Sequence, residues 1–290
     1  MSFDTVMGTV MQWATAAEAL AAVGAEVGLA QSGAEVSPEV TSALRAVSNA
    51  AGLGDLDELE PQQKGMVAAM ARLYLVQALD ILDSPDRAGS WTFTDPVILD
   101  GWGRGSMLMP GLINGTVPGV GETTSFLDIG TGVGLLAVAA ASVWPNARIV
   151  GIDIWEPALA RARANVAQAG LEGRIELRAQ NVVDLDDADR FDLIWVPTFF
   201  LSEATLVQAF PALLRAAQPG ATIVLGLWQA LPNPLAAAVT ALRTVRSGGE
   251  ELEAKRGVDL LEAAGFTDVR HVTPQVPAPL DFIVGQKPAA

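Results

Sequence analysis

The spacing of apolar residues changes character near Thr124. Before that point, apolar residues recur at steps of three and four, as they do along one face of a helix. The first such stripe consists of Val6, Val10, Trp13, Ala17 and Leu20. Two further helices are predicted to begin at Pro38, with Ser37 as the N-cap, and at Pro61. We therefore expect a helical N-terminal domain over residues 1–116, whose first stripe favours an interface over a catalytic role.

From Thr124 onward, short apolar runs alternate with helical stretches. The runs lie at 125–130, 147–154, 174–180, 191–197 and 221–228, and the helices at 133–143, 156–170 and 203–217. Apolar strands that alternate with helices indicate a parallel sheet covered on both faces. After a helix at 257–264, the last two runs, 267–274 and 280–287, are joined by a short loop, which predicts an antiparallel pair at the sheet edge. The pattern predicts an α/β domain over residues 117–290.

Composition narrows the range of partners and chemistries. The chain has 33 acidic and 18 basic residues, a net charge of −15, so we expect neither nucleic acid nor a membrane as its partner. It has no cysteine and a single histidine, His271, which argues against thiolate chemistry and a histidine metal centre. A carboxylate-held Mg²⁺ stays open. The N-terminus lacks the basic region of a signal peptide, and no uncharged apolar run reaches membrane-spanning length, so we expect a cytoplasmic protein.

The stretch "SFLDIGTGVG", residues 125–134, carries the most specific chemistry. Glycines between a buried strand and a helix let a ligand approach the backbone. Asp128 lies two positions before Gly130, where a carboxylate suits an ammonium group and repels a pyrophosphate. Asp153 follows Gly130 by 23 residues, close to the usual spacing of an acid that accepts ribose hydroxyls. Asn181, just past the third strand, can read the amino edge of an adenine.

Together these segments resemble a class I S-adenosylmethionine-dependent methyltransferase over residues 124–287. "FLDIGTGVG" resembles the glycine-rich motif, "VGIDI" the acidic second motif, "QNVVDL" the adenine loop and "FDLIWVP" the fourth strand. "LLRAAQPGATIVLGLW" and "LLEAAGFTDVR" resemble the segments that close the fold. The resemblance implies a Rossmann-like, seven-stranded, mostly parallel sheet whose last strand is antiparallel. The helical region before it resembles that of bacterial small-molecule methyltransferases, which implies a homodimer interface and a lid over the substrate.

The resemblance also implies roles for individual residues toward S-adenosylmethionine. Gly130, Thr131, Gly132 and Gly134 would contact its methionine part, Asp128 its ammonium and Asp153 its ribose, while Ile154, Trp155, Asn181 and Val182 would surround the adenine. Two departures from the family pattern matter. The adenine loop often carries Asp where this chain has Asn181. The fourth strand ends in "VPTFF" and not in the Asn/Asp-Pro-Pro-aromatic signature of enzymes that methylate nucleic-acid bases or glutamine.

The residues that would contact the methyl acceptor are less well defined by the sequence. Methyl transfer from a sulfonium demands alignment and exclusion of water, and a hydroxyl acceptor usually needs a base. We expect His271 to be structural, on an edge strand remote from the ligand, which leaves Asp95, Asp100 and Glu203 as candidate bases. An amine, carboxylate or carbon acceptor would need little help. The expected substrate pocket is apolar and aromatic, formed by Trp102, Met107, Met109, Phe199, Phe200 and Trp228. Arg104 is expected either to bind the cofactor or substrate or to pair with an acid.

The sequence therefore predicts an S-adenosylmethionine-dependent methyltransferase of a small metabolite, acting on oxygen, nitrogen or carbon. Two alternatives stay open. One is a protein methyltransferase. The other is a protein of this fold that binds the cofactor without transferring its methyl group, as a scaffold or in a non-methylating rearrangement.

Overall fold

The computed structural model describes residues 1–87, 89, 91–276 and 278–289. The chain divides into two units. The first consists of residues 1–85 and 95–102, and the second of residues 86–94 and 103–290. Each unit has its own hydrophobic core.

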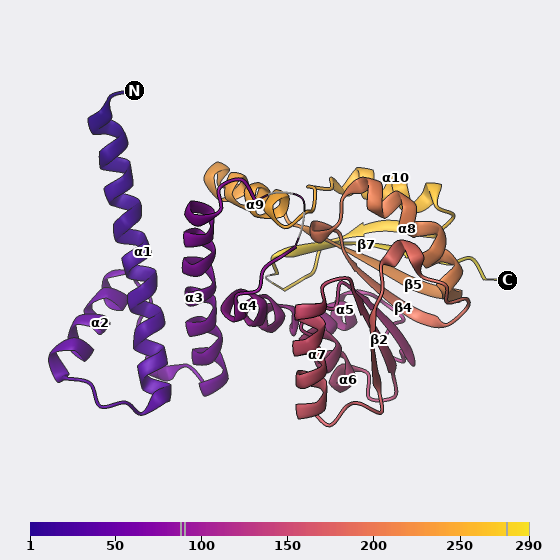
Figure 1. The fold of residues 1–290 in the computed structure, drawn as a ribbon, viewed down its shortest axis with the longest axis horizontal. Helices are drawn as coiled ribbons and strands as arrows, with labels where there is room; N and C mark the ends of the chain where they lie inside the picture. Colours follow the sequence, from indigo (N-terminus) through magenta and orange to yellow (C-terminus); the bar gives the residue numbers. More distant parts are fainter. Residues whose placement is uncertain (88, 90, 277, 290) are drawn as a thin grey trace. The chain divides into compact units, whose positions relative to one another are not determined.

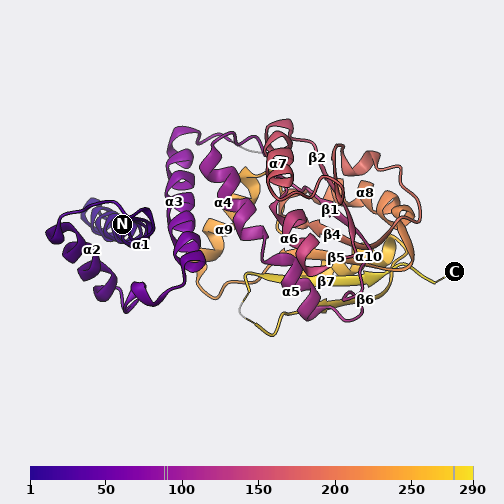
Figure 2. The ribbon, with the colours of Figure 1, turned by 90° about the horizontal axis from the view of Figure 1, so that it is seen from below.

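The first unit is helical, as the apolar spacing predicted. It contains α1 (Phe3–Ser32), α2 (Pro38–Ala50), a short 3₁₀ turn η1 (Leu56–Glu58), α3 (Pro61–Asp83) and the first part of α4 (Pro96–Ser106). The Ser37 hydroxyl accepts a hydrogen bond from the Val40 N–H at 3.4 Å, which confirms the predicted start of α2. Helices α1 and α2 lie side by side (Figure 2), and α1 approaches α3 closely because Gly24 faces Ala71.

Helix α3 also has the length and apolar content of a membrane-spanning helix. It is the one helix in the described part of the chain that has both. It carries Lys64 and Arg72, and it packs against α1. A helix packed inside a domain passes the same test, so this feature alone does not assign α3 to a membrane.

The second unit is built on a seven-stranded sheet in the order β3-β2-β1-β4-β5-β7-β6. The strands are β1 (Ser125–Ile129), β2 (Arg148–Asp153), β3 (Ile175–Ala179), β4 (Phe191–Pro197), β5 (Ala217–Trp228), β6 (Thr267–Val272) and β7 (Leu280–Gln286). The first five are parallel, and β7 runs antiparallel to both β5 and β6. The predicted fold class is thereby confirmed, including its reversed last strand.

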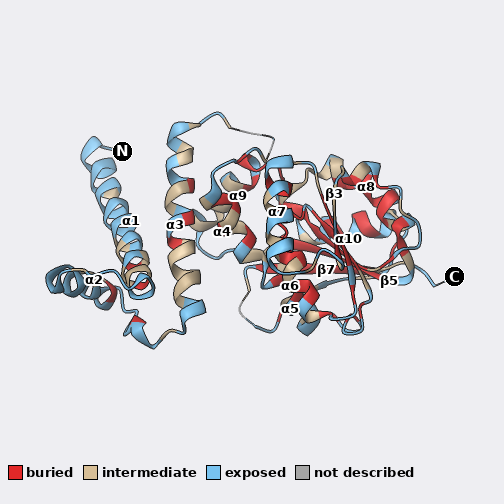
Figure 3. Cartoon of the chain, turned by 60° about the horizontal axis from the view of Figure 1, so that its bottom comes forward, coloured by how far each residue is buried: buried red, intermediate tan, exposed pale blue. Residues whose placement is uncertain are grey.

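Helices cover both faces of this sheet because its strands are apolar on both sides. Leu127, Ile194 and Ile223 pack with residues of α8 (Glu203–Ala216) and α10 (Ala254–Ala263). Phe126 and Leu193 pack on the opposite face with α5 (Met109–Thr116) and α6 (Leu135–Val143). Figure 1 shows these two layers, and Figure 3 shows the strands mostly in the colour of buried residues. The remaining helices are α7 (Glu156–Gln168), α9 (Pro234–Arg246) and the short turns η2 (Val182–Asp184) and η3 (Thr198–Phe200).

Two features differ from the pattern read in the sequence. The last crossing of the chain from the first unit to the second lies after Trp102, after an earlier one at residues 86–94, and not at the expected boundary between residues 116 and 117. The reason is that Met109 and Ile113 of α5 are buried in the same cluster as Phe126 and Trp144, so α5 belongs to the second unit. In addition, α9 occupies a segment where no element was expected. Its start is marked by an Asn-Pro pair, and the Asn233 side chain accepts hydrogen bonds from the N–H groups of Leu235 and Ala236.

Candidate functional site

The loop between β1 and α6 has the conformation that only glycine adopts without strain. Gly130, Gly132 and Gly134 have φ values of +65°, +55° and +75°. The Thr131 N–H donates to the Ile152 carbonyl at 3.0 Å, which fastens the loop to β2. The next strand makes room for that contact, because a Cβ at Gly151 would lie 2.6 Å from Thr131 Oγ1. The glycines are therefore required by the turn and leave its backbone bare.

Asp128 lies under this loop at the end of β1. Its side chain is buried, with 1% of its surface exposed, and its Oδ2 accepts a hydrogen bond from the Thr131 hydroxyl at 2.7 Å. Burial raises the pKa of Asp128 to about 7, and the nearby Asp153 carboxylate adds to the rise, against the Thr131 hydrogen bond, which lowers it. A nearby positive charge would stabilise the ionised form of this buried carboxyl group.

Asp153 ends β2 on the other side of the loop. Its Oδ2 accepts from the Gly132 N–H at 2.8 Å and its Oδ1 from the Trp155 N–H at 2.8 Å. Burial raises its pKa, while these backbone hydrogen bonds oppose the rise. Each carboxylate oxygen has a second acceptor position, so Asp153 can still accept from a pair of ligand hydroxyls.

The residues expected around an adenine follow β2 and β3. The Ile154 side chain is 73% exposed, and the Trp155 indole donates to the Phe93 carbonyl at 3.0 Å. The Asn181 side-chain oxygen caps η2 by accepting from the Val183 N–H at 3.3 Å, so one acceptor position is in use and its NH₂ group is not part of that bond. Val182 is buried, so its side chain belongs to the core. The structure thus brings Asp128, the glycine loop and Asp153 into one hydrogen-bonded group, with the adenine residues on the neighbouring strand ends.

Three of the expected pocket residues meet in an aromatic cluster. The Phe199 and Phe200 ring centroids are 4.7 Å apart, and the Phe199 and Trp228 centroids are 4.6 Å apart. Trp91 extends the cluster, with its centroid 4.9 Å from that of Phe200. Phe199 and Trp228 line a cavity of about 440 Å³ at the carboxyl ends of β4 and β5, which is a usual size for a small-molecule site.

His271 also lines this cavity, which corrects the expectation that it lies remote from ligand-binding strand ends. It is on the edge strand β6, as predicted, but next to the carboxyl end of that strand. Its Nε2 is 3.0 Å from Oδ2 of Asp281 on β7. Sequence reasoning missed Asp281 because the pair forms across two strands. The only signal was that two short strands joined by a loop would run side by side.

The other expected site residues are placed as follows. Trp102, Asp95 and Asp100 belong to the first unit, where Asp95 caps α4 by accepting from the Val97 N–H at 2.7 Å. In the second unit, Arg104 and Met107 are exposed, and Met109 is buried in the core of the sheet and is not one of the residues that line the cavity. Any part that Trp102, Asp95, Asp100, Arg104 or Met107 has in binding or catalysis stays a prediction.

Glu203, the remaining candidate base, is tied to an arginine at the start of α8. The Arg256 guanidinium bonds to its carboxylate, and this hydrogen bond lowers the pKa of Glu203. A lowered pKa makes a carboxylate a weaker base, so this contact argues against a catalytic role.

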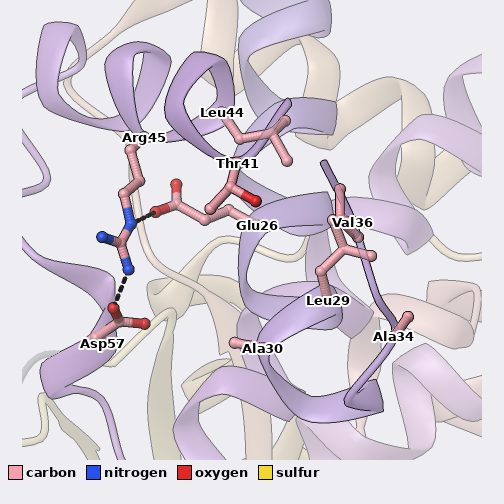
Figure 4. A pocket seen from close by; sticks show the side chains of 9 residues that line it. All are labelled: Glu26, Leu29, Ala30, Ala34, Val36, Thr41, Leu44, Arg45 and Asp57. Carbon is pink, nitrogen blue, oxygen red and sulfur yellow. Dashed lines mark hydrogen bonds and ion pairs between the residues drawn. The ribbon is translucent and has the colours of Figure 1, made fainter. Parts of the chain in front are cut away.

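The first unit contains a separate cavity of about 310 Å³ between α1 and α2. Figure 4 shows Arg45 at its rim, between Glu26 and Asp57. None of the residues expected from the sequence to bind a ligand lines it. Within the described residues, no three His, Asp or Glu side chains gather as a metal site in either unit.

Comparison with known proteins bears on this geometry. Residues 126–220 match the model of the family described as "Methyltransferase domain". A tRNA1(Val) (adenine(37)-N6)-methyltransferase of Pedobacter heparinus is 33% identical over 94 residues, which cover 32% of this chain and 40% of that protein. The chain therefore spans less than half the length of this curated relative.

Solved structures match over nearly the whole chain. An O-methyltransferase family protein from Burkholderia thailandensis has a TM-score of 0.69 at 13% identity, covering 100% of this chain and 99% of that one. Human N-acetylserotonin methyltransferase, solved in complex with S-adenosylmethionine, has a TM-score of 0.67 at 16% identity, covering 99% of both chains. At these identities the likeness is one of fold.

The second unit has the fold of the class I methyltransferases, with the helical region before it that these neighbours share. Within it, residues 126–220 form a methyltransferase domain. The class read from the glycine loop and its two acids is thereby confirmed.

Proposed function

We propose that this chain transfers the methyl group of S-adenosylmethionine to a small organic molecule. The observation that carries the proposal is the group formed by Asp128, the left-handed glycine loop and Asp153. Asp128 offers a buried carboxylate to an ammonium group, and Asp153 offers acceptors to ribose hydroxyls. The match of residues 126–220 to a methyltransferase domain supports S-adenosylmethionine as the cofactor.

The bound cofactor would supply an electrophilic methyl group on a sulfonium. The chain's own part is to bind, to orient and to exclude water. The glycine loop lies next to β4, since a Cβ at Gly130 would be 3.7 Å from Pro197 Cγ. The residues that follow β4, Thr198 and Phe199 of η3, line the cavity of about 440 Å³. The cofactor loop and the cavity are thus adjacent along one strand end, which suits a direct transfer between two bound molecules.

A small-molecule acceptor is supported by the full-length likeness to N-acetylserotonin methyltransferase and by the net charge of −15. A second candidate is methylation of a nucleic-acid base, which the name of the tRNA methyltransferase relative favours. The "VPTFF" end of β4 and the acidity of the chain make it the weaker candidate. The homodimer and the cytoplasmic location stay predictions.

Calorimetric titration with S-adenosylmethionine and S-adenosylhomocysteine tests the cofactor site. We expect micromolar binding by the wild type. Asp153→Asn, which keeps one acceptor for the loop amides, should weaken binding by roughly tenfold or more, since a hydrogen bond to a charged group contributes about 1.5–3 kcal/mol. Glu172→Gln, at an exposed acid in the loop before β3, is the matched control and should bind as the wild type does.

Transfer is then measured with labelled cofactor against a panel of hydroxylated and amino aromatics and against unmodified tRNA. Label in a small molecule supports the proposal, and label only in tRNA supports the second candidate. Cofactor binding without transfer to any acceptor would favour the non-methylating alternative. No binding by the wild type would contradict the proposal as a whole.

A further inference from the structure

The cavity beside the glycine loop has a definite order of side chains from one end to the other. At one end are Thr198 and Phe199, directly after Pro197 of β4. Trp228, at the end of β5, forms the next part of the wall. At the other end is the pair of His271 and Asp281 from β6 and β7. The cavity therefore extends along the sheet edge, away from the cofactor loop.

The strand registers give the length of this site. Pro197 pairs with Gly226, Gly226 with Phe282, and Phe282 with Val272, which places the four in one row across the sheet. Three strand spacings amount to about 14 Å. His271 precedes Val272, so it lies too far from the glycine loop to act as the base on an acceptor atom there. The His271–Asp281 pair is instead placed to hold the far end of a substrate.

The pair is held in place by a third side chain. Asp281 Oδ1 accepts from the Gln229 side-chain amide at 3.0 Å, while Oδ2 faces His271 Nε2. A carboxylate only accepts, so Nε2 is the donor in this bond, which fixes the orientation of the ring. His271 is 41% exposed, and among the residues that the structure describes, no partner is recorded for its Nδ1. The cavity thus ends in the Asp281 carboxylate, which Gln229 and His271 hold in a fixed orientation.

The charged side chains that line the cavity are mainly acidic. Its carboxylates are those of Glu250, Glu251, Glu253 and Asp281, and the described lining residues include no lysine or arginine. The tilted Phe199 and Trp228 rings add aromatic walls, which favour flat molecules and attract cations. Such a lining attracts a positive group and repels an anion.

We propose that the cavity binds a planar aromatic acceptor that carries a basic amine, with the amine held by the His271–Asp281 pair at the end remote from the transferred methyl. This deepens the proposed function, on which it rests for the identity of the bound molecule as the methyl acceptor. Asp281 and His271 are then positioning residues that select the substrate.

The test is binding of three probes that share a ring and differ in charge: naphthylmethylamine, naphthylmethanol and naphthoic acid, substituted at the same ring position. We expect the amine to bind most tightly by calorimetry and the acid not to bind measurably. Asp281→Asn should weaken the amine about tenfold or more and leave the alcohol within about twofold, since only the amine loses a charged partner. His271→Gln should also weaken the amine more than the alcohol, but by a smaller factor. Trp228→Leu should weaken the binding of both probes.

Glu172→Gln is again the control, and thermal unfolding of every variant shows that it folds. Equal binding of amine and acid by the wild type would overturn the inference, as would equal losses for amine and alcohol in Asp281→Asn. S-adenosylmethionine titrations on the same proteins separate the two proposals. Failure of amine selectivity with intact cofactor binding rejects only this inference. No cofactor binding by the wild type, with selectivity intact, rejects the methyltransferase proposal and with it the role of the bound molecule as methyl acceptor, and leaves the amine-binding site.

Discussion

Asp128 is a carboxyl group whose burial the fold tolerates because a hydroxyl and, in the proposed function, a cation compensate it. Its folded-state pKa is about 7, against an ordinary value of 3.8, with burial as the main cause. The folded chain therefore holds a proton that the unfolded chain has already lost between about pH 4 and 7. The contribution to stability is fully present below about pH 4 and is lost as the pH rises through about 7.

We expect Asp128→Asn, which mimics the protonated acid, to remove this pH dependence. The wild type should lose stability from pH 5 to pH 8, by an amount on the order of a few kcal/mol, while the variant should change much less. Above pH 7 the variant should be the more stable protein. Urea unfolding at a series of pH values measures this, with the exposed Glu172→Gln as control. Parallel curves for Asp128→Asn and the wild type would contradict the burial of an acid at this position.

For individual residues, the prediction from sequence agrees with the structure where the residues lie close together in the chain. Asp128, Gly130 and Asp153 were predicted because they lie along one strand–loop–helix–strand unit, where the distance in sequence fixes the distance in space. His271 and Asp281 were not predicted as a pair. Their contact depends on the register that places His271 opposite Ile283, with Asp281 its diagonal neighbour, and register is not written in the spacing of either strand alone.

Among the elements, the glycine loop fits closely against β2. A Cβ at Gly151 would lie 2.6 Å from Thr131 Oγ1 and 2.9 Å from its Cβ, so Thr131 would have to move. Thr131 is also the hydrogen-bond donor to Asp128. We expect Gly151→Ala to destabilise the chain by about 1–3 kcal/mol, as overpacking does, and to weaken cofactor binding in the same titration.

Gly173→Ala is the control for this change. Gly173 lies between α7 and β3 and no atom would lie within 4 Å of its added Cβ, so its stability should stay within about 0.5 kcal/mol of the wild type. Urea unfolding followed by circular dichroism measures both. A Gly151→Ala variant as stable as Gly173→Ala would mean that the loop is not held against β2 as described.

The helices and strands could be predicted from the spacing of apolar residues wherever burial imposes a regular pattern. The strand β4, Phe191–Pro197, has the predicted bounds because both its faces are buried. Helix α9 was missed because it is rich in alanine and begins after a proline-containing turn, although Leu235, Val239 and Leu242 recur at steps of four and three. Its Asn233 cap was nevertheless present in the sequence as a start signal. The domain boundary was missed because α5 resembles the helices before it, while its burial depends on Phe126 and Trp144, which follow it in the chain.

For the whole molecule, the feature of widest consequence is an exposed apolar stripe on α1. The first half of this helix exposes Phe3, Val6, Met7, Val10, Met11 and Trp13, the last at 53%. An apolar stripe of this kind on a chain of net charge −15 favours association with a second apolar surface. A second copy of the same stripe would give the isologous contact of a two-fold homodimer, in keeping with the expected interface.

We expect the chain to be a dimer by sedimentation velocity and Trp13→Glu to shift it to monomer, because a charge at the centre of an apolar interface is costly to bury. Gln168→Glu, which adds the same charge at an exposed position on α7, should leave the dimer intact. Cofactor titration of the monomeric variant then tests whether cofactor binding requires the dimer. Because Asp128, the glycine loop and Asp153 all belong to that unit, we expect its affinity for S-adenosylmethionine to match that of the wild type. A wild type that sediments as a monomer would contradict the dimer and leave the cofactor site as proposed.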